Sequence, residues 1–541
     1  MNKKLAIYLP LILAFIFVAG FFIGSQYSNG IASNSQNLGI SFGKNYNKLN
    51  ELVNYIENEY VDSVEREQLT DKIISDLLQE LDPHSYYMSA EETQRMSEPL
   101  EGKFEGIGVQ FSIQADTIVV INPVPGGPSE KLGVMAGDRI VNVDDELVAG
   151  VEITNSDVMK KLKGPAGTNL NIEVKRKGST KLISFDITRD RIPINSVDVA
   201  YMIQPKIGFI KLSRFSKTTY QEFIASAEDL LNERMDKMIL DLRGNGGGIM
   251  SAATNIADEF LKDGELIVYT EGKARPKESF YASNKGILED IGLIVLIDAA
   301  SASASEIIAG AIQDNDRGRI IGRRSFGKGL VQEQNDWPDG SATRLTIARY
   351  YTPSGRSIQK PYDKGTDEYN EEYYNRFDSG ELASADSIHL ADSLEYRTKS
   401  GRIVYGGGGI MPDVFIPLDT SGNSWYLSEL FYSGQFYDFS FKYTDKNRKS
   451  LNEYSDYRDF KENFKVGPEL LGEFVDFASK NGVKPDEEGL SKSKNVIKFR
   501  IRAGISRNLY NDQGFYPVVN EFDLTVKEAL KSFDEDLVSI Q

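Results

Sequence analysis

Residues 291–314 read IGLIVLIDAASASASEIIAGAIQD, and this stretch indicates both a fold class and a place for chemistry. Its first ten residues are apolar almost throughout, which is typical of a strand buried on both faces of a parallel sheet. Its last part has the apolar spacing of a helix, and Ser303 and Glu306 fit the S-x-x-E capping box at the start of that helix. Open α/β sheets also place active groups where a helix begins directly after a buried parallel strand. Ser303 is therefore a capping residue or a nucleophile, and both roles fit that place.

Strands and helices alternate on both sides of this stretch. Each of two predicted strands precedes an amphipathic helical segment: 207–215 before 218–235, and 237–244 before 248–261. Such alternation predicts right-handed βαβ units and an α/β fold. We assign residues 191–418 to this α/β core, in which the acidic, tyrosine-rich segment of about 363–400 is expected to be an exposed insertion.

The chain around the core divides into three further regions. Apolar residues at helical spacing predict an N-terminal helical region at 45–98, which Pro83 interrupts. Short alternating or β-branched segments predict a small β-rich domain at 99–190. Aromatic and charged helical segments predict a mainly helical extension at 419–541. This extension either binds a partner or completes the core, and the sequence leaves both roles open.

The N-terminus carries an export signal. Two lysines precede an uncharged run at 5–24, which is long enough to cross about 30 Å of hydrocarbon as a helix. This length favours a signal anchor at 1–24, followed by a flexible tether at 25–44, over a cleaved signal peptide. The positive charge on the short leading side predicts a single transmembrane helix in the inner (cytoplasmic) membrane, with the body in the periplasm or otherwise outside the cytoplasm.

Composition argues against several classes of site. The net charge of −18 opposes nucleic-acid binding, which needs a basic face. Without cysteine the chain can form no disulfide, thiolate metal site or cysteine nucleophile. Its two histidines, His84 and His389, could form a zinc pair only by converging from distant segments, and no EF-hand-like loop is present. We predict neither a metal nor a cofactor.

A serine nucleophile needs a base. Neither histidine has a nearby partner motif, so the sequence does not support a Ser–His pair, although geometry does not exclude one, and the other choice is lysine. Lysine acts as a base only when desolvation lowers its pKa to about 7–8. In RRSFGKGLVQ (323–332), Lys328 lies between two glycines, which let the backbone approach a crowded site closely. Its alternative reading is a solvated loop lysine. Ser325 and Lys328 also match the S-x-x-K spacing of serine β-lactamases, but the glycines oppose the helical turn that this motif needs.

The segments SASASEIIAGAIQD (301–314) and SFGKGLVQ (325–332) together resemble the signature of the C-terminal processing peptidases. These are tail-specific serine proteases of the S41 type, and the resemblance covers about residues 50–418. It implies a ClpP/crotonase-like α/β protease core in which a Ser–Lys dyad performs acyl transfer. By position, Ser303 would be the nucleophile and Lys328 the general base.

The same resemblance implies roles for residues around the dyad. Gln332 would orient the lysine, and Asp314 would support the site. The segment LDLRGNGGG (240–248) lacks the lysine and Ser/Thr of a phosphate-binding loop, and it resembles a family motif that follows a strand. The oxyanion hole would then consist of the amides of Ala304 and of Gly247 or a neighbouring glycine.

The β-rich domain at 99–190 is similar to a PDZ domain. PDZ domains bind an extended C-terminus by strand addition and hold its carboxylate with backbone N–H groups. The segment EGIGVQF, ahead of an alternating strand and a later AGDRI segment, resembles the carboxylate-binding loop. That loop would consist of Gly106, Ile107, Gly108 and Val109.

These resemblances imply an exported, membrane-anchored serine endopeptidase that selects polypeptides by apolar C-terminal tails. Its partners would be those protein substrates and, through the N-terminal helix, the membrane, while a homo-oligomer is left open. The alternative is a non-catalytic PDZ scaffold on a protease-like fold, which the joint presence of Ser303, Lys328 and Gln332 opposes. A crotonase-like acyl-CoA enzyme is a further alternative, which the export signal and the PDZ resemblance oppose.

Overall fold

A computed structural model describes residues 45–388 and 394–534. The chain divides into two compact units, residues 1–77 and 78–541. The first is described over α2 (Asn45–Glu59) and most of α3 (Arg66–Gln79). Among the described residues, none of the helices combines the length and the apolar character needed to cross a bilayer. The predicted anchor and tether, residues 1–44, lie outside the described residues.

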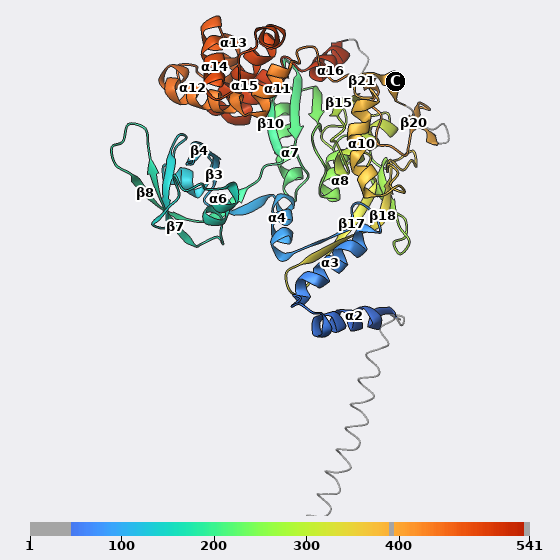
Figure 1. Ribbon diagram of the computed structural model, residues 1–541. Coiled ribbons are helices and arrows are strands. Elements are labelled where there is room, and N and C mark those ends of the chain that lie inside the picture. The colour runs from blue at the N-terminus through green and yellow to red at the C-terminus, as the bar shows by residue number, and fades with distance from the viewer. Residues whose placement is uncertain (1–44, 389–393, 535–541) are drawn as a thin grey trace, which may run out of the picture. The chain divides into compact units, whose positions relative to one another are not determined.

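The second unit is built on a six-stranded sheet in the order β10-β11-β12-β15-β16-β21 (Figure 1). Strands β11 to β21 pair in parallel, and β10 is antiparallel to β11. The predicted strand–helix alternation is confirmed over this region. The strands are β10 (Val197–Gln204), β11 (Ile207–Leu212), β12 (Lys237–Asp241), β15 (Gly292–Ile297), β16 (Arg319–Gly322) and β21 (Val414–Phe415).

Side-chain alternation along these strands buries both faces of the sheet. In β15, Leu293 and Val295 pack in one apolar cluster with α7 (Thr219–Asn232), α8 (Met250–Asp258) and α9 (Ala304–Asp314). Ile294 and Leu296 point to the other face, where they cluster with α16 (Leu524–Asp534). The C-terminal extension therefore completes the core, because it covers a face of the sheet that would otherwise be exposed.

A second sheet carries the segment that follows the predicted base. It has the order β1-β18-β13-β14, and β17 pairs with β18 in a hairpin that turns at Asp339-Gly340. In the sequence WPDGSATRLTIARYYTPSG (337–355), Asp339-Gly340 is a turn signal that predicts this hairpin. Its strands are β1 (Tyr86–Met88), β13 (Leu266–Glu271), β14 (Glu278–Tyr281), β17 (Leu330–Asp336) and β18 (Ala342–Tyr351).

The β-rich domain predicted at 99–190 contains a sheet in the order β3-β4-β5-β7-β8, with β6 paired to β5, whereas residues 99–101 still belong to helix α4 (Ala90–Glu101). It has its own buried cluster, which includes Ile118, Ile140 and Ile172. A separate ribbon pairs β2 (Lys103–Gly106) with β9 (Asp190–Pro193). The other elements are β3 (Val109–Ile113), β4 (Ile118–Pro123), α5 (Pro128–Lys131), β5 (Arg139–Val143), β6 (Glu146–Leu147), α6 (Asn155–Leu162), β7 (Asn169–Lys175) and β8 (Ile183–Thr188).

The C-terminal extension is helical, as predicted, and has an apolar core of its own that includes Leu430, Phe460, Phe474 and Ile497. Its helices are α11 (Trp425–Tyr432), α12 (Gln435–Leu451), α13 (Tyr457–Asn463), α14 (Pro468–Lys480), α15 (Glu487–Val519, kinked at Tyr510 and Asn511) and α16.

The acidic segment at 363–400 is exposed over most of α10 (Thr366–Asp378), as predicted, but it also packs against the core. Besides α10 it forms a short 3-10 helix (Ala385–Ser387) and β19 (Glu395–Arg397), which pairs with β20 (Ile403–Tyr405). Arg376 of α10 is 3% exposed and donates to the carbonyls of Ser325 (2.8 Å) and Phe326 (3.2 Å). The composition of the segment does not predict this packing of Arg376, because most of its charged residues are acidic and face solvent.

Candidate active site

The turn between β15 and α9 holds Ser303 in an uncommon backbone conformation, with φ 55° and ψ −112°. A non-glycine residue held there costs about 1–3 kcal/mol, and such strain gathers at functional sites. The Ser303 N–H donates to the Glu306 carboxylate at 2.7 Å, as the predicted capping box requires. The Glu306 N–H donates to the Ser303 carbonyl at 2.8 Å. The turn is thus fixed through its backbone.

Glu306 joins this turn to the segment that carries Lys328. Its carboxylate is 0% exposed, and besides Ser303 it accepts from the Ser325 hydroxyl (2.6 Å), the Gly327 N–H (2.7 Å) and the Lys328 N–H (2.9 Å). Burial raises the pKa of Glu306, and these donors act against that rise. Sequence analysis assigned Glu306 to the cap alone, and the long-range contacts carry no sequence signal.

Ser303 and Lys328 line the same cavity, which has a volume of about 460 Å³. Burial lowers the pKa of Lys328, and the positive charge of Arg344 lowers it further, whereas Glu306 and Asp82 act in the opposite direction. No hydrogen bond joins the Ser303 hydroxyl to Lys328 Nζ among the described residues, and such contacts often tighten only when substrate is bound. The other predicted residues at this cavity are Ala304, Gly247 and Gln332.

The glycine segment at 240–248 lies directly against Ser303. At Gly247 (φ 97°) an added Cβ would lie 2.8 Å from Ser303 Cβ and 2.7 Å from the Ala302 carbonyl, so only glycine fits. The Gly247 amide donates to Asn245 Oδ1 at 2.9 Å. The Ala304 amide begins α9, and an amide at that place has no partner within its helix. The oxyanion role of Ala304 and Gly247 stays a prediction.

An ion-pair cluster around Arg243 fixes the position of this glycine segment. Arg243 donates to Asp241 (2.9 and 2.7 Å) and to both carboxylate oxygens of Asp523 (3.0 and 2.8 Å), which precedes α16. Burial alone would raise the pKa of Asp241, but Arg243 and Lys211 hold it down at about 2. The extension therefore contacts the segment that carries Gly247, through a residue that sequence analysis did not identify.

A second chain of contacts leads away from Gln332, which the resemblance assigns to orienting the lysine. Gln332 donates to the Thr346 hydroxyl at 3.4 Å, and Thr346 donates to Asp82 at 3.1 Å. The neighbouring His84 ring lies 2.7 Å from the Tyr369 hydroxyl. Burial and Lys328 lower the pKa of His84 to about 4, so that this ring is neutral near pH 7. In sequence the LDPHS segment indicates only a helix break, yet its Asp82 accepts the last hydrogen bond of this series of contacts.

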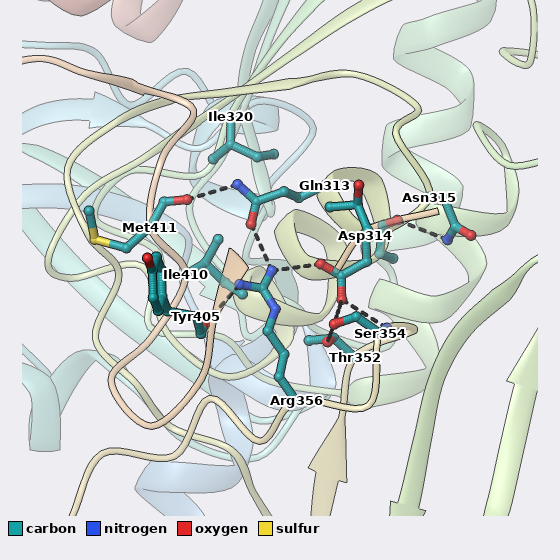
Figure 2. A network of polar contacts seen from close by, with 12 residues as sticks. Gln313, Asp314, Asn315, Ile320, Thr352, Ser354, Arg356, Tyr405, Ile410 and Met411 are labelled. Atoms are coloured by element: carbon teal, nitrogen blue, oxygen red, sulfur yellow. Dashed lines mark hydrogen bonds and ion pairs between the residues drawn. The ribbon is translucent and has the colours of Figure 1, made fainter. Parts of the chain in front are cut away.

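Asp314 lies at the opposite end of α9 from Ser303, in a buried network (Figure 2). Eleven residues of helix put the two ends about 16 Å apart. Asp314 accepts from Arg356 Nη2 at 2.7 Å and from the Ser354 hydroxyl at 2.7 Å, and Arg356 also donates to Gln313 and to the Tyr405 carbonyl. Asp314 can therefore support the site only through the position of the helix.

The predicted PDZ loop lies between β2 and β3, and none of its four residues lines the Ser303 cavity. The Ile107 carbonyl accepts from the Ser129 hydroxyl at 2.6 Å, and the Gly108 carbonyl accepts from the Val124 N–H at 2.9 Å. Gly108 has φ 72°, a conformation that favours glycine.

Within the described ranges, no three Asp, Glu or His side chains converge as metal ligands would, and His389 lies outside those ranges.

Comparison with known families gives four matches along the chain. The profile of peptidase family S41 matches residues 206–367, and that of the PDZ domain matches residues 106–187. An N-terminal domain described as that of the activating protease CtpB matches residues 19–93. A family of unknown function matches residues 426–511, within the C-terminal extension.

Individual relatives agree with these matches. The carboxy-terminal-processing protease of Bartonella bacilliformis is 34% identical over 63% of this chain and 79% of its own length. The carboxy-terminal processing protease CtpA of Bacillus subtilis is 33% identical over 58% of this chain and 67% of its own. A solved structure, the photosystem II D1 C-terminal processing protease, is 27% identical over 69% of this chain and 87% of that chain, with a TM-score of 0.36.

Proposed function

The chain belongs to peptidase family S41, among the carboxy-terminal processing serine proteases, and on that premise we propose that it cuts polypeptides with a dyad of Ser303 and Lys328. The observation that carries the dyad is the shared cavity. A strained serine at the start of a helix and a lysine with a lowered pKa line the same space, and Glu306 holds the backbones of both.

In the proposed reaction, neutral Lys328 Nζ takes the Ser303 hydroxyl proton while Oγ attacks the carbonyl carbon of the scissile bond. The oxyanion that forms accepts hydrogen bonds from the Ala304 amide and the glycine segment. The C–N bond then breaks, and the Lys328 ammonium returns the proton to the leaving amine. Water then attacks the resulting ester while Lys328 takes a proton from it. The C–Oγ bond breaks, the Lys328 ammonium gives that proton to Ser303 Oγ, and the second product leaves.

Substrate choice in this proposal rests on the PDZ domain. Gly106 to Val109 would hold the carboxylate of an apolar tail, while a more distant part of the same polypeptide enters the cavity. An aspartate at the tail would bring extra negative charge to a site built for one carboxylate.

The test uses the chain from residue 30 onward and an unfolded protein that ends either in a short apolar tail or in Asp-Asp. We expect the apolar-tailed protein to be cut at least about 10-fold faster, because remote tail binding is what selects it. In the Ser303→Ala variant cleavage should fall by at least about 10³-fold. Cleavage that survives this substitution would refute the dyad, and tail binding without any cleavage would support the scaffold alternative.

We also propose that residues 1–24 anchor the protein in the inner membrane with its body outside the cytoplasm. The support is the uncharged run at 5–24 and its two leading lysines. The full-length chain should sediment with the membrane fraction and resist extraction by carbonate, whereas the chain from residue 30 onward should not. Full-length protein recovered in the soluble fraction would rule out an anchor.

A further inference from the structure

A second cavity, of about 680 Å³, lies between the core and the C-terminal extension, where α11, α15 and the start of α16 line it together with core residues such as Arg243 and Arg323. We call it the extension pocket. Its apolar wall includes Leu427, Phe431, Val496, Phe499 and Phe522. This volume lies within the range of about 300–1,000 Å³ that small-ligand sites occupy, and such sites combine apolar walls with a few convergent polar groups.

Three further positive side chains line the same pocket: Arg323, Arg500 and Lys527. None of them has a carboxylate at ion-pair distance among the described residues, although Lys527 adds to the Ser421 hydrogen bonds in lowering the pKa of Asp419. The Arg500 guanidinium lies 5.6 Å from the Phe431 ring centre and 5.9 Å from that of Phe499. Burial lowers the pKa of Arg500. Arg323 has one long contact, of 3.5 Å, to the Ile416 carbonyl.

The pocket also contains two carboxylates, and both are engaged. Asp523 accepts two bonds from Arg243, and Asp419 accepts from the hydroxyl (2.6 Å) and the N–H (3.0 Å) of Ser421. Arg500 and Lys527 are exposed and Arg323 is half-buried, so the open side of the pocket presents several positive charges next to the apolar wall. The charge balance of the pocket therefore favours a ligand with a negative group.

We propose that the extension pocket binds a carboxylate attached to an apolar body. The aromatic and aliphatic wall would take the body, and Arg500, with Arg323 or Lys527, would take the carboxylate through charge-assisted hydrogen bonds. Two sources have this chemistry: a peptide that ends in apolar residues, and a medium-chain fatty acid.

Occupancy of this pocket bears on the active site through Arg243. Arg243 lines the extension pocket, pairs with Asp523, and belongs to the segment that carries Gly247. A ligand that shifts the Arg243–Asp523 pair would shift that segment as well. This consequence rests on the proposed function, whereas binding itself does not.

The experiment measures binding by calorimetry on the chain from residue 30 with Ser303→Ala, so that no peptide is consumed. The probes are decanoate and N-acetyl-Leu-Phe, with decanamide and the amide of the dipeptide as neutral controls. We expect at least one carboxylate to bind, its amide to bind at least about 10-fold more weakly, and Arg500→Gln/Lys527→Gln to weaken carboxylate binding by a similar factor. The matched control is Lys494→Gln, an exposed lysine on α15 that does not line the pocket.

The outcomes separate the sources. Binding of decanoate alone assigns the pocket to fatty acids, and binding of the dipeptide alone assigns it to peptide tails. Carboxylate binding that the double variant leaves unchanged overturns the proposal, because it would lie elsewhere, as in the PDZ loop. No binding of either probe also overturns it. If the double variant loses its helical circular dichroism, Arg500→Gln and Lys527→Gln are compared singly.

Discussion

Replacing Lys328 with alanine is expected to lower kcat/KM for an apolar-tailed substrate by about 10³-fold, within the range that a positioned general base contributes. The cause is the loss of a proton acceptor for the Ser303 hydroxyl. His84, which interacts electrostatically with Lys328, does not line the Ser303 cavity and bonds to Tyr369. Steady-state cleavage rates check this. Lys328→Arg should be equally inactive, because a guanidinium stays protonated, and activity in that variant would contradict the base assignment.

The pH profile provides a sharper test, because the base must be neutral. Activity should rise with pH through the pKa of Lys328 and then reach a plateau. Asp82 raises that pKa and Arg344 lowers it. Asp82→Asn should therefore move the rising limb to lower pH, and Arg344→Gln should move it to higher pH. Profiles of kcat/KM for the two variants check this, and shifts in the same direction would show that Lys328 does not set the limb.

Local patterns predicted the backbone of this protein well. The buried strand β15 and helix α9 follow from apolar runs and spacing within one segment, and the serine turn follows from the junction between them. The hairpin at Asp339-Gly340 follows from its turn residues in the same way. In each case the residues that decide the structure are neighbours in sequence, so the pattern contains the information.

The contacts that hold the candidate site are different in kind. Glu306 and Gly327 are 21 positions apart, whereas Asp82 and Thr346 are 264 apart and Arg243 and Asp523 are 280 apart. A single sequence gives no sign that such pairs meet, because each member has an adequate local interpretation as a cap, a helix breaker or a surface charge. The Ser303–Lys328 dyad is a prediction from family resemblance, whereas the contacts around these two residues became visible only in the fold.

Asp314 shows how this affects a functional assignment. The resemblance gives it a supporting role, and the structure places it in an ion pair with Arg356 in which both side chains are 0% exposed (Figure 2). Arg356 Nε has no hydrogen-bond partner among the described residues. The hydrogen bonds of the network therefore offset only part of the free energy that it costs to remove the guanidinium from water. A buried ion pair adds little to the stability of a protein compared with apolar residues in the same place. Removing only one partner, however, leaves the other charge buried and uncompensated.

Arg356→Met is therefore expected to lower the free energy of unfolding by about 3–5 kcal/mol, and Asp314→Asn by a comparable amount. The double variant should recover part of the loss, because neither charge is then left alone. Arg397→Met is the matched control: Arg397 of β19 pairs with Glu395, and their side chains are 63% and 37% exposed, so the loss should be about 1 kcal/mol or less. Denaturant unfolding monitored by circular dichroism measures all four.

The kinetics of the same variants decide what Asp314 does. If it only fixes the far end of α9, then Asp314→Asn at a temperature where it is fully folded should keep kcat within about 10-fold of the parent, and the double variant should be closer still. The reason is that a charge about 16 Å from Ser303 cannot exchange protons with the dyad. A fall of 10³-fold in kcat with unchanged unfolding free energy would contradict this, and would mean that the far end of α9 takes part in the chemistry itself.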